Sequence, residues 1–235
     1  MGFVSYNSST MNLHLFSTPG KDNIRYILDA SRPYLEVKEV PIVAHLPAAS
    51  LSNTWQEFTE KAFHDLARVE TINTEMMALP EMEAALRNAA LLYIPGGNTF
   101  LLNHRLHISK IMEYLRRKVT AGLPVVAFSA GTLLCGPNIL TSQDMNMVGT
   151  SYFSGLNATA FNFSVHYPED EFARLSQDEW LHQYHVFHDN PILLLADGAY
   201  VQVKGKKTIL VQGEAWILRK GQEKQKLEAD QPIPL

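Results

Sequence analysis

The chain has 235 residues, of which 46% are hydrophobic and 19% charged, and its formal net charge is −4. A chain of this length can bury a sizeable core, and we expect residues 1–235 to form a single α/β domain. The negative charge argues against a nucleic-acid partner, and the single cysteine, Cys135, excludes an internal disulfide. No apolar stretch approaches the roughly 20 residues that span a bilayer, and no signal-peptide core is present. We therefore expect a cytoplasmic protein without a membrane partner.

Strand-like and helix-like segments alternate through the first half of the chain. Short apolar or β-branched runs predict strands at residues 12–17, 40–44, 69–72, 90–94 and 125–128. Amphipathic or Ala-rich runs between them predict helices at residues 22–32, 52–69, 81–89 and 99–121. This alternation indicates a three-layer fold with a mostly parallel central sheet and helices on both faces. Ligands of such folds usually gather at the carboxyl ends of the strands.

The second half of the chain contains shorter predicted elements. An alternating run predicts a strand at residues 160–166. A helix is expected at residues 176–188, where Ser176 fits an N-cap and Glu179 completes a capping box. Residues 192–218 contain short strand runs separated by turn dipeptides. We expect these runs to form short antiparallel C-terminal strands packed on the same domain.

The apolar run Val125–Phe128 stops at Ser129, which is followed by Ala130 and Gly131. A buried strand that turns sharply into a helix lifts a serine hydroxyl above the carboxyl edge of a sheet. The A-x-S-x-G pattern here is one residue short of the G-x-S-x-G elbow. Ser129 is therefore the candidate nucleophile, and the alternative is a strand-to-helix turn that merely holds a small serine.

A second loop is expected to open on the same edge of the sheet. Gly96 and Gly97 follow the strand predicted at residues 90–94. Glycines allow backbone N–H groups to approach a substrate closely, as an oxyanion hole requires. The alternative is that these glycines only make a tight turn.

A serine nucleophile needs a base within hydrogen-bond reach and a carboxylate that orients this base. His166 is the best placed of the nine histidines because it closes a predicted strand. His182, His185 and His188 share a predicted helix and raise the question of a metal site. Their i, i+3, i+6 spacing spreads them over about 120° of the helix surface. This divergence argues against three ligands on one ion.

Two carboxylates are candidates for orienting His166. Asp144 lies in the polar loop after the elbow, and Asp197 lies at a predicted strand end. Each also has an ordinary explanation, because Asp144 could cap a helix or loop and Asp197 belongs to an Asp-Gly turn. The residues themselves leave both candidates open.

Four segments combine into a more specific pattern. They are Pro95-Gly96-Gly97-Asn98-Thr99-Phe100, Phe128-Ser129-Ala130-Gly131, Thr141-Ser142-Gln143-Asp144-Met145 and Val165-His166. Together they resemble the peptidase E family, the α-aspartyl dipeptidases and their relatives. That family has a Gly-Gly-Asn-Thr loop, a Trp-Ser-Ala-Gly elbow, an Asn-Asp-Met loop and a His-Phe pair in the same order at similar spacings. The likeness runs from about Leu91 to Trp216.

The resemblance implies a class-I-glutamine-amidotransferase-like, flavodoxin-like fold in which serine takes the place of the usual cysteine. It also implies a serine-type dipeptidase that hydrolyses short peptides through an acyl-enzyme. We expect no cofactor. Ser129 matches the nucleophile and His166 the general base. The family's third member is described either as the aspartate that matches Asp144 or as a glutamate that matches Asp197. We favour Asp197 and give Asp144 a structural role.

The same resemblance implies which groups contact the substrate. The backbone N–H groups of Gly96 or Gly97 and of Ala130 match the oxyanion donors. Asn98 belongs to the same glycine loop, and we include it among the expected substrate-binding residues. The expected partner is a short peptide, and a homodimer stays open.

One departure concerns recognition of the substrate side chain. The family recognises an aspartyl side chain through an arginine, and Gln177 occupies the matching place. A neutral amide cannot supply the bidentate pairing of guanidinium with carboxylate, and the neighbouring Asp178 and Glu179 would repel an acidic group. Arg174 could substitute only if the loop is shifted. The sequence therefore argues against a strict preference for N-terminal aspartate.

Two further functions stay open at this stage. One is a non-catalytic relative that binds a small peptide on the same scaffold, and the other is a cyanophycinase-like amidase that acts on a β-linked aspartyl polymer. A cysteine amidotransferase is disfavoured because Cys135 lies six residues past Ser129.

Overall fold

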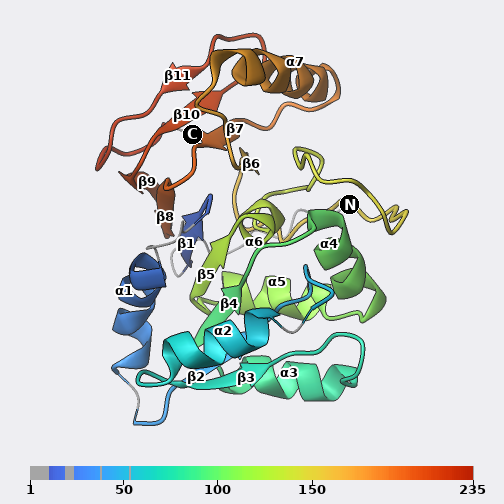
Figure 1. Cartoon of the computed structure of the whole chain (residues 1–235), viewed down its shortest axis with the longest axis vertical. Coiled ribbons are helices and arrows are strands. Elements are labelled where there is room, and N and C mark those ends of the chain that lie inside the picture. Colours follow the sequence, from blue (N-terminus) through green and yellow to red (C-terminus); the bar gives the residue numbers. More distant parts are fainter. Residues whose placement is uncertain (1–10, 19–23, 38, 53, 235) are drawn as a thin grey trace.

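Seven strands form the central sheet of the computed structural model, which describes residues 11–18, 24–37, 39–52 and 54–234 (Figure 1). The strand order is β3-β2-β4-β5-β1-β8-β9. The five parallel strands are β1 (Asn12–Phe16), β2 (Ile42–His45), β3 (Arg68–Thr71), β4 (Leu91–Ile94) and β5 (Val125–Phe128). β8 (Tyr200–Lys204) and β9 (Lys207–Gln212) extend the sheet in antiparallel pairing. The predicted α/β fold with a mostly parallel sheet is confirmed.

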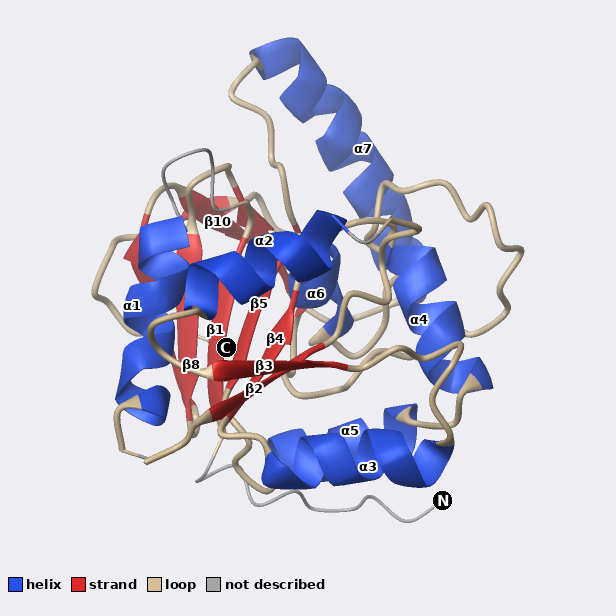
Figure 2. Cartoon of the chain, turned by 60° about the horizontal axis from the view of Figure 1, so that its bottom comes forward, coloured by secondary structure: helices blue, strands red, loops and turns tan. Residues whose placement is uncertain are grey.

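Helices cover both faces of this sheet (Figure 2). They are α1 (Ile24–Leu35) and α2 (Thr54–Phe63) on one face, and α3 (Leu79–Asn88), α4 (Thr99–Ile108) and α5 (Met112–Thr120) on the other. Because successive strand residues point to opposite faces, Leu91 and Tyr93 pack in the α1 and α2 layer. Leu92 and Ile94 of the same strand pack in the opposite layer. This double coverage explains why β4 and β5 are apolar throughout.

The C-terminal strands are divided between two sheets. β6 (Asn162–Ser164), β7 (Ile192–Leu195), β10 (Ala215–Leu218) and β11 (Gln225–Lys226) form a second sheet in the order β11-β10-β7-β6. β6 and β7 pair in parallel, whereas β7, β10 and β11 are antiparallel. The prediction of one antiparallel group at residues 192–218 was therefore incomplete, because β8 and β9 leave it to pair with β1. Hairpin-like spacing cannot reveal which sheet a strand joins.

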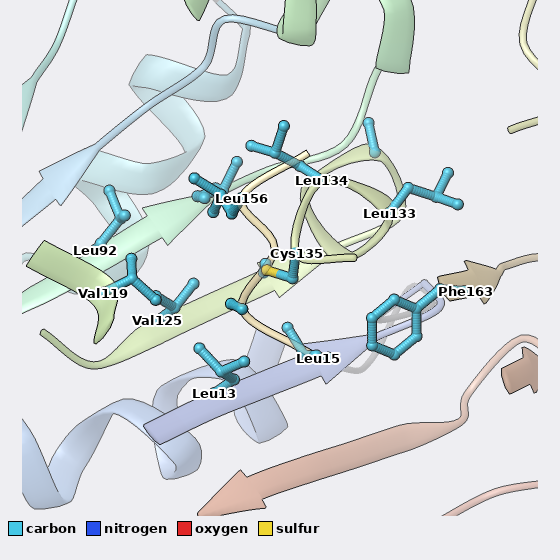
Figure 3. Packing of buried hydrophobic residues seen from close by; sticks show 14 of the residues in the cluster. Leu13, Leu15, Leu92, Val119, Val125, Leu133, Leu134, Cys135, Leu156 and Phe163 are labelled. Carbon is cyan, nitrogen blue, oxygen red and sulfur yellow. The ribbon is translucent and has the colours of Figure 1, made fainter. Parts of the chain in front are cut away.

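The two sheets share one hydrophobic core. Figure 3 shows Leu15 of β1, Val125 of β5 and Phe163 of β6 around the buried Cys135. Cys135 directly follows the short helix α6 (Ala130–Leu134). This packing sets the position of the second sheet relative to the strand ends of the first.

The helix predicted at residues 99–121 is two helices. α4 ends at Ile108, and Lys110 adopts a left-handed conformation with φ 64° before α5 begins at Met112. The Ser109 hydroxyl donates to the carbonyl of Arg105 at 2.7 Å, which stabilises the end of α4. No Gly or Pro lies at this break, so the sequence pattern predicted one continuous helix.

The helix predicted at residues 176–188 begins earlier and ends one residue earlier. α7 spans Glu171–Phe187, and Asp170 is its N-cap, accepting the Ala173 N–H at 2.9 Å. The capping box predicted at Ser176 was therefore wrong, because Asp170, six residues earlier, already supplies the cap. His188 is the C-cap.

Other boundaries also differ from the predictions by a few residues. α2 stops at Phe63 rather than at residue 69, since the N–H groups of Leu66 and Ala67 both turn back to the Phe63 carbonyl. Asp22, the predicted start of the first helix, lies outside the described residues.

Within the described ranges, no helix is both long enough and apolar enough to cross a bilayer.

Candidate active site

Ser129 lies at the turn between β5 and α6 in a strained conformation, with φ 51° and ψ −115°. Its N–H donates to the carbonyls of Phe16 and Ser17 at 3.1 and 2.9 Å, which ties the turn to the end of β1. Gly131 allows this turn, because a Cβ there would lie 2.3 Å from the Ile94 carbonyl oxygen. Strain of this kind persists only where the surroundings impose it, and it is common at active sites.

His166 follows β6 and reaches the serine. Its Nε2 lies 2.9 Å from the Ser129 Oγ, which is hydrogen-bond distance. His166 also has a positive φ, 55°, and its backbone N–H donates to the Ser17 Oγ at 2.8 Å. Its side chain is 48% exposed, so solvent and substrate can reach the imidazole.

Asp197 follows β7 and contacts the other side of the imidazole. Its Oδ1 lies 2.7 Å from the His166 Nδ1. A carboxylate at Nδ1 favours the tautomer that carries its proton there, and this leaves Nε2 free to accept the Ser129 hydroxyl proton. Three loops that follow three different strands thus bring a hydroxyl, an imidazole and a carboxylate into one chain of hydrogen bonds.

Asp144 makes a different set of contacts. Its Oδ2 accepts the backbone N–H of Thr99 at 2.7 Å, the Thr99 hydroxyl at 2.6 Å and the Ser142 hydroxyl at 3.1 Å. The carboxylate therefore fastens the loop after α6 to the first residue of α4. Ser129, His166 and Asp144 line the same small pocket, but the hydrogen bond to the imidazole comes from Asp197.

The two positions after β4 require glycine because neighbouring atoms leave no room for a Cβ. A Cβ on Gly96 would lie 3.0 Å from the Ser129 Cβ, and a Cβ on Gly97, where φ is 139°, would lie 2.4 Å from the Ala49 carbonyl oxygen. The loop therefore runs directly beside the serine, and any larger residue would push it away. Ala130 is the first residue of α6, so its N–H has no acceptor within that helix.

Asn98 has a structural position. Its Oδ1 accepts the Leu101 N–H at 2.9 Å as the N-cap of α4, and its Nδ2 donates to the Met145 carbonyl at 2.9 Å. Both ends of the amide are therefore used to hold the glycine loop and the 141–146 loop together.

Gln177 lies on α7 and is 4% exposed, with its Nε2 donating to the Ser164 Oγ at 2.7 Å. It lines an open pocket of about 720 Å³, which shares Ser142, Gln143 and Asp144 with the small pocket beside Ser129. The pocket is lined by Ser142, Gln143, Asp144, Pro168, Phe172, Ala173, Ser176, Gln177 and Trp180, without a basic side chain among these residues. Sequence reasoning missed Phe172 and Trp180 as pocket residues. Phe172 lies before the predicted start of the helix and joins the pocket because α7 begins at Glu171.

The Arg174 side chain makes its contacts outside this pocket. Its Nε donates to the Pro168 carbonyl at 2.5 Å, and its guanidinium lies over the rings of Tyr167 and Trp216, 5.6 and 5.0 Å from their centroids. These contacts hold it away from the pocket that Gln177 lines.

The remaining histidines and the cysteine do not join this site. Burial lowers the pKa of both His14 and His45 to about 4, so they are neutral core residues. The His185 imidazole pairs with the Asn190 carbonyl at 3.1 Å. Burial also raises the pKa of the Cys135 thiol to about 12. Over the described part of the chain, no group of three or more His, Cys, Asp or Glu residues is arranged to hold a metal ion.

These positions can be compared with known sequences. The profile described as "Peptidase family S51" matches residues 16–211. The chain belongs to peptidase family S51. This span includes the elbow at Ser129 together with His166 and Asp197. The resemblance to peptidase E is confirmed.

Similar curated proteins have names that agree with this family. The "Probable alpha-aspartyl dipeptidase" of Drosophila melanogaster is 35% identical over 148 residues, covering 61% of this chain and 60% of that protein. "Peptidase E" of a Nostoc species is 35% identical over 131 residues, covering 53% and 52%. The chain therefore spans between half and two thirds of these two relatives. "Peptidase E" of Shigella flexneri is 26% identical over 216 residues, covering 90% and 93%.

Solved structures show the same fold. A structure described as a peptidase E protein from Listeria monocytogenes EGD-e superposes with a TM-score of 0.68 at 24% identity, covering 85% of this chain and 97% of that one. A peptidase from an acI-B1 Actinobacterium superposes with a TM-score of 0.72 at 16% identity, covering 97% and 98%.

Proposed function

We propose that this chain is a serine peptidase that hydrolyses short peptides through an acyl-enzyme. One observation carries the proposal, namely the continuous pair of hydrogen bonds from the Ser129 Oγ through the His166 imidazole to the Asp197 carboxylate. Membership of family S51 and the names of its relatives support peptide hydrolysis as the reaction. The shared core of the two sheets supports a single domain as the working unit.

The mechanism follows from the roles that this geometry allows. The His166 Nε2 takes the hydroxyl proton as the Ser129 Oγ attacks the scissile carbonyl carbon, and a C–O bond forms. The imidazolium then gives this proton to the leaving amine as the C–N bond breaks. A water molecule, deprotonated by the same imidazole, then attacks the ester carbonyl carbon. The C–O bond to the Ser129 Oγ breaks, the imidazolium returns its proton to this oxygen, and the acid product leaves. Asp197 holds the Nδ1 proton and stabilises the imidazolium throughout.

The developing oxyanion needs donors beside Ser129. The backbone N–H groups of Gly96 or Gly97 and of Ala130 are the candidates, because the glycine loop passes within contact distance of the serine. Backbone donors held by a tight turn need no reorganisation during the reaction. This explains why the loop uses glycines where side chains would collide.

For specificity, we propose that the pocket beside Gln177 takes an uncharged side chain. An aspartyl carboxylate there would meet the Asp144 carboxylate and no cation among the lining residues. Burying an unpaired charge is costly, whereas an amide or hydroxyl can exchange hydrogen bonds with Gln177. The aromatic rings of Phe172 and Trp180 add apolar surface to the same pocket.

Replacement of Gln177 by arginine should shift this preference. We expect Gln177→Arg to raise kcat/KM for Asp-X dipeptides relative to Asn-X dipeptides by roughly ten- to a hundredfold, because a charge-assisted bond to the carboxylate replaces a neutral one. A dipeptide library assayed with both proteins measures the ratio. Gln183→Arg is the matched control, since it adds the same charge at an exposed position of α7. A wild-type protein that already prefers Asp-X would contradict the proposed specificity.

The proposed nucleophile is tested by covalent labelling. A fluorophosphonate probe should attach to the Ser129 Oγ, and peptide mapping should locate the adduct there. Labelling should be lost in Ser129→Ala and weakened in Asp197→Asn. An unlabelled protein that still binds dipeptides would favour a non-catalytic binding function. Cleavage of β-aspartyl-arginine without cleavage of α-dipeptides would favour an amidase.

A further inference from the structure

Ser17 lies at the end of β1 and is completely buried, yet its atoms touch all three loops of the site. Its carbonyl accepts the Ser129 N–H at 2.9 Å. Its hydroxyl accepts the backbone N–H of His166 at 2.8 Å and lies 3.2 Å from the Asp197 Oδ1 and 3.1 Å from the Leu195 carbonyl. The sequence predicted only a strand residue here, because Ser17 carries no motif.

The hydroxyl chemistry matches these contacts. A serine hydroxyl has one hydrogen to donate and two lone pairs to accept with. One lone pair takes the His166 N–H, and the single hydrogen goes to the Asp197 carboxylate or to the Leu195 carbonyl. Both possible acceptors belong to the same segment, β7 and the turn after it. In either arrangement, one buried oxygen links the backbone of His166 to the segment that carries Asp197.

The imidazole and carboxylate need such a link. The side chains of His166 and Asp197 are 48% and 58% exposed, so surrounding packing does little to hold them. His166 also adopts a positive φ of 55°, a conformation that costs energy in a residue other than glycine. An anchor on its N–H opposes relaxation of this backbone. The Asp197 Oδ1 that faces Ser17 is the same oxygen that meets the His166 Nδ1.

We propose that Ser17 is a positioning residue, which sets the geometry of the His166 and Asp197 pair through its buried hydroxyl. The inference rests on the proposed peptidase function and adds a residue to it. Ser17 does not touch substrate or the reacting atoms. Its effect passes through the backbone of His166 and the carboxylate of Asp197.

The first test compares Ser17→Ala with the wild-type protein. Kinetic constants for a cleaved dipeptide should show kcat lowered by about ten- to a hundredfold with KM little changed, because a small misplacement of the base slows the chemical step. Ser31→Ala is the matched control. Ser31 is equally buried and donates only to the Ile27 carbonyl within α1, so its removal should leave kcat unchanged. A Ser17→Ala protein with wild-type kcat, or with a change in KM alone, overturns the proposal.

The second test needs no activity. In ¹⁵N-labelled protein at alkaline pH, the imidazole nitrogen shifts of His166 report how much of the ring carries its proton on Nδ1. Ser17→Ala should move this tautomer population toward that of Asp197→Asn, and Ser31→Ala should not. Unchanged shifts in Ser17→Ala overturn the proposal. If Ser129→Ala keeps wild-type turnover, the peptidase mechanism fails while the tautomer measurement still decides the role of Ser17.

A further variant separates the hydroxyl from simple packing. Ser17→Cys fills nearly the same space with a group that bonds weakly. It should show the same fall in kcat and the same tautomer shift as Ser17→Ala. If Ser17→Ala does not fold, Ser17→Cys carries both measurements, and wild-type values in it contradict the positioning role.

Discussion

Replacement of Ser129 by alanine is expected to lower kcat by about 10⁴-fold or more, while leaving the protein folded. The Ser129 Oγ makes its hydrogen bond to the half-exposed His166, so its loss opens no buried cavity. Without the oxygen, no acyl-enzyme can form, and only binding and the oxyanion donors remain. Steady-state hydrolysis of a dipeptide series measures the loss, and thermal unfolding checks the fold.

Two comparisons make this result interpretable. Ser151→Ala changes an exposed serine outside the site and should have wild-type kinetics, which controls for preparation and for contaminating peptidases. Ser129→Gly should be as inactive as Ser129→Ala and more stable, because glycine tolerates the φ of 51° that strains other residues. Wild-type turnover by Ser129→Ala would rule out serine catalysis at this position.

The second large effect is expected at Asp197. We expect Asp197→Asn to lower kcat by roughly 10³- to 10⁴-fold, because a neutral amide neither holds the imidazole proton on Nδ1 nor stabilises the imidazolium. The carboxylate oxygen lies 2.7 Å from this nitrogen, so the isosteric change removes charge and acceptor preference without altering shape. The kcat of Asp197→Asn, measured over a range of pH, gives the result.

Asp144→Asn is the matched comparison, because it makes the same chemical change at the other candidate carboxylate. It should keep kcat within a few-fold of wild type. It should lower the free energy of unfolding by about 1 kcal/mol, since a charged acceptor at the first turn of α4 becomes neutral. A severe loss of kcat in Asp144→Asn with little effect in Asp197→Asn would make Asp144 the partner of His166.

The sequence by itself determined the parallel sheet and the place of the candidate serine. The alternation of apolar runs with amphipathic segments is a local signal, and it correctly predicted β4, β5 and their helical cover. Because the carboxyl ends of parallel strands meet at one edge, the glycine loop and the Ser129 turn could be expected together. The role of Ser129 as nucleophile stays a prediction until it is measured.

Helix boundaries were less well determined by sequence. The break at Lys110 carries no Gly or Pro, and the cap at Asp170 competes with an equally plausible cap at Ser176. Such choices depend on how each helix packs, and packing involves residues far away in the chain. The pocket changed as a result, because an earlier start of α7 brings Phe172 into it.

Only the tertiary structure decided which polar groups meet. The residues alone left Asp144 and Asp197 both open as partners of His166, and only the family resemblance favoured Asp197. In the fold, Asp144 contacts the α4 N-terminus and Asp197 contacts His166. Likewise, the Arg174 guanidinium packs on Trp216, so no basic side chain is among the residues that line the pocket with Gln177. No sequence motif marks Ser17, because its hydroxyl contacts His166 and Asp197 only when the fold brings the ends of β1, β6 and β7 together. Contacts between side chains on separate strands depend on how distant segments of the chain pack together. Local sequence patterns do not contain this information.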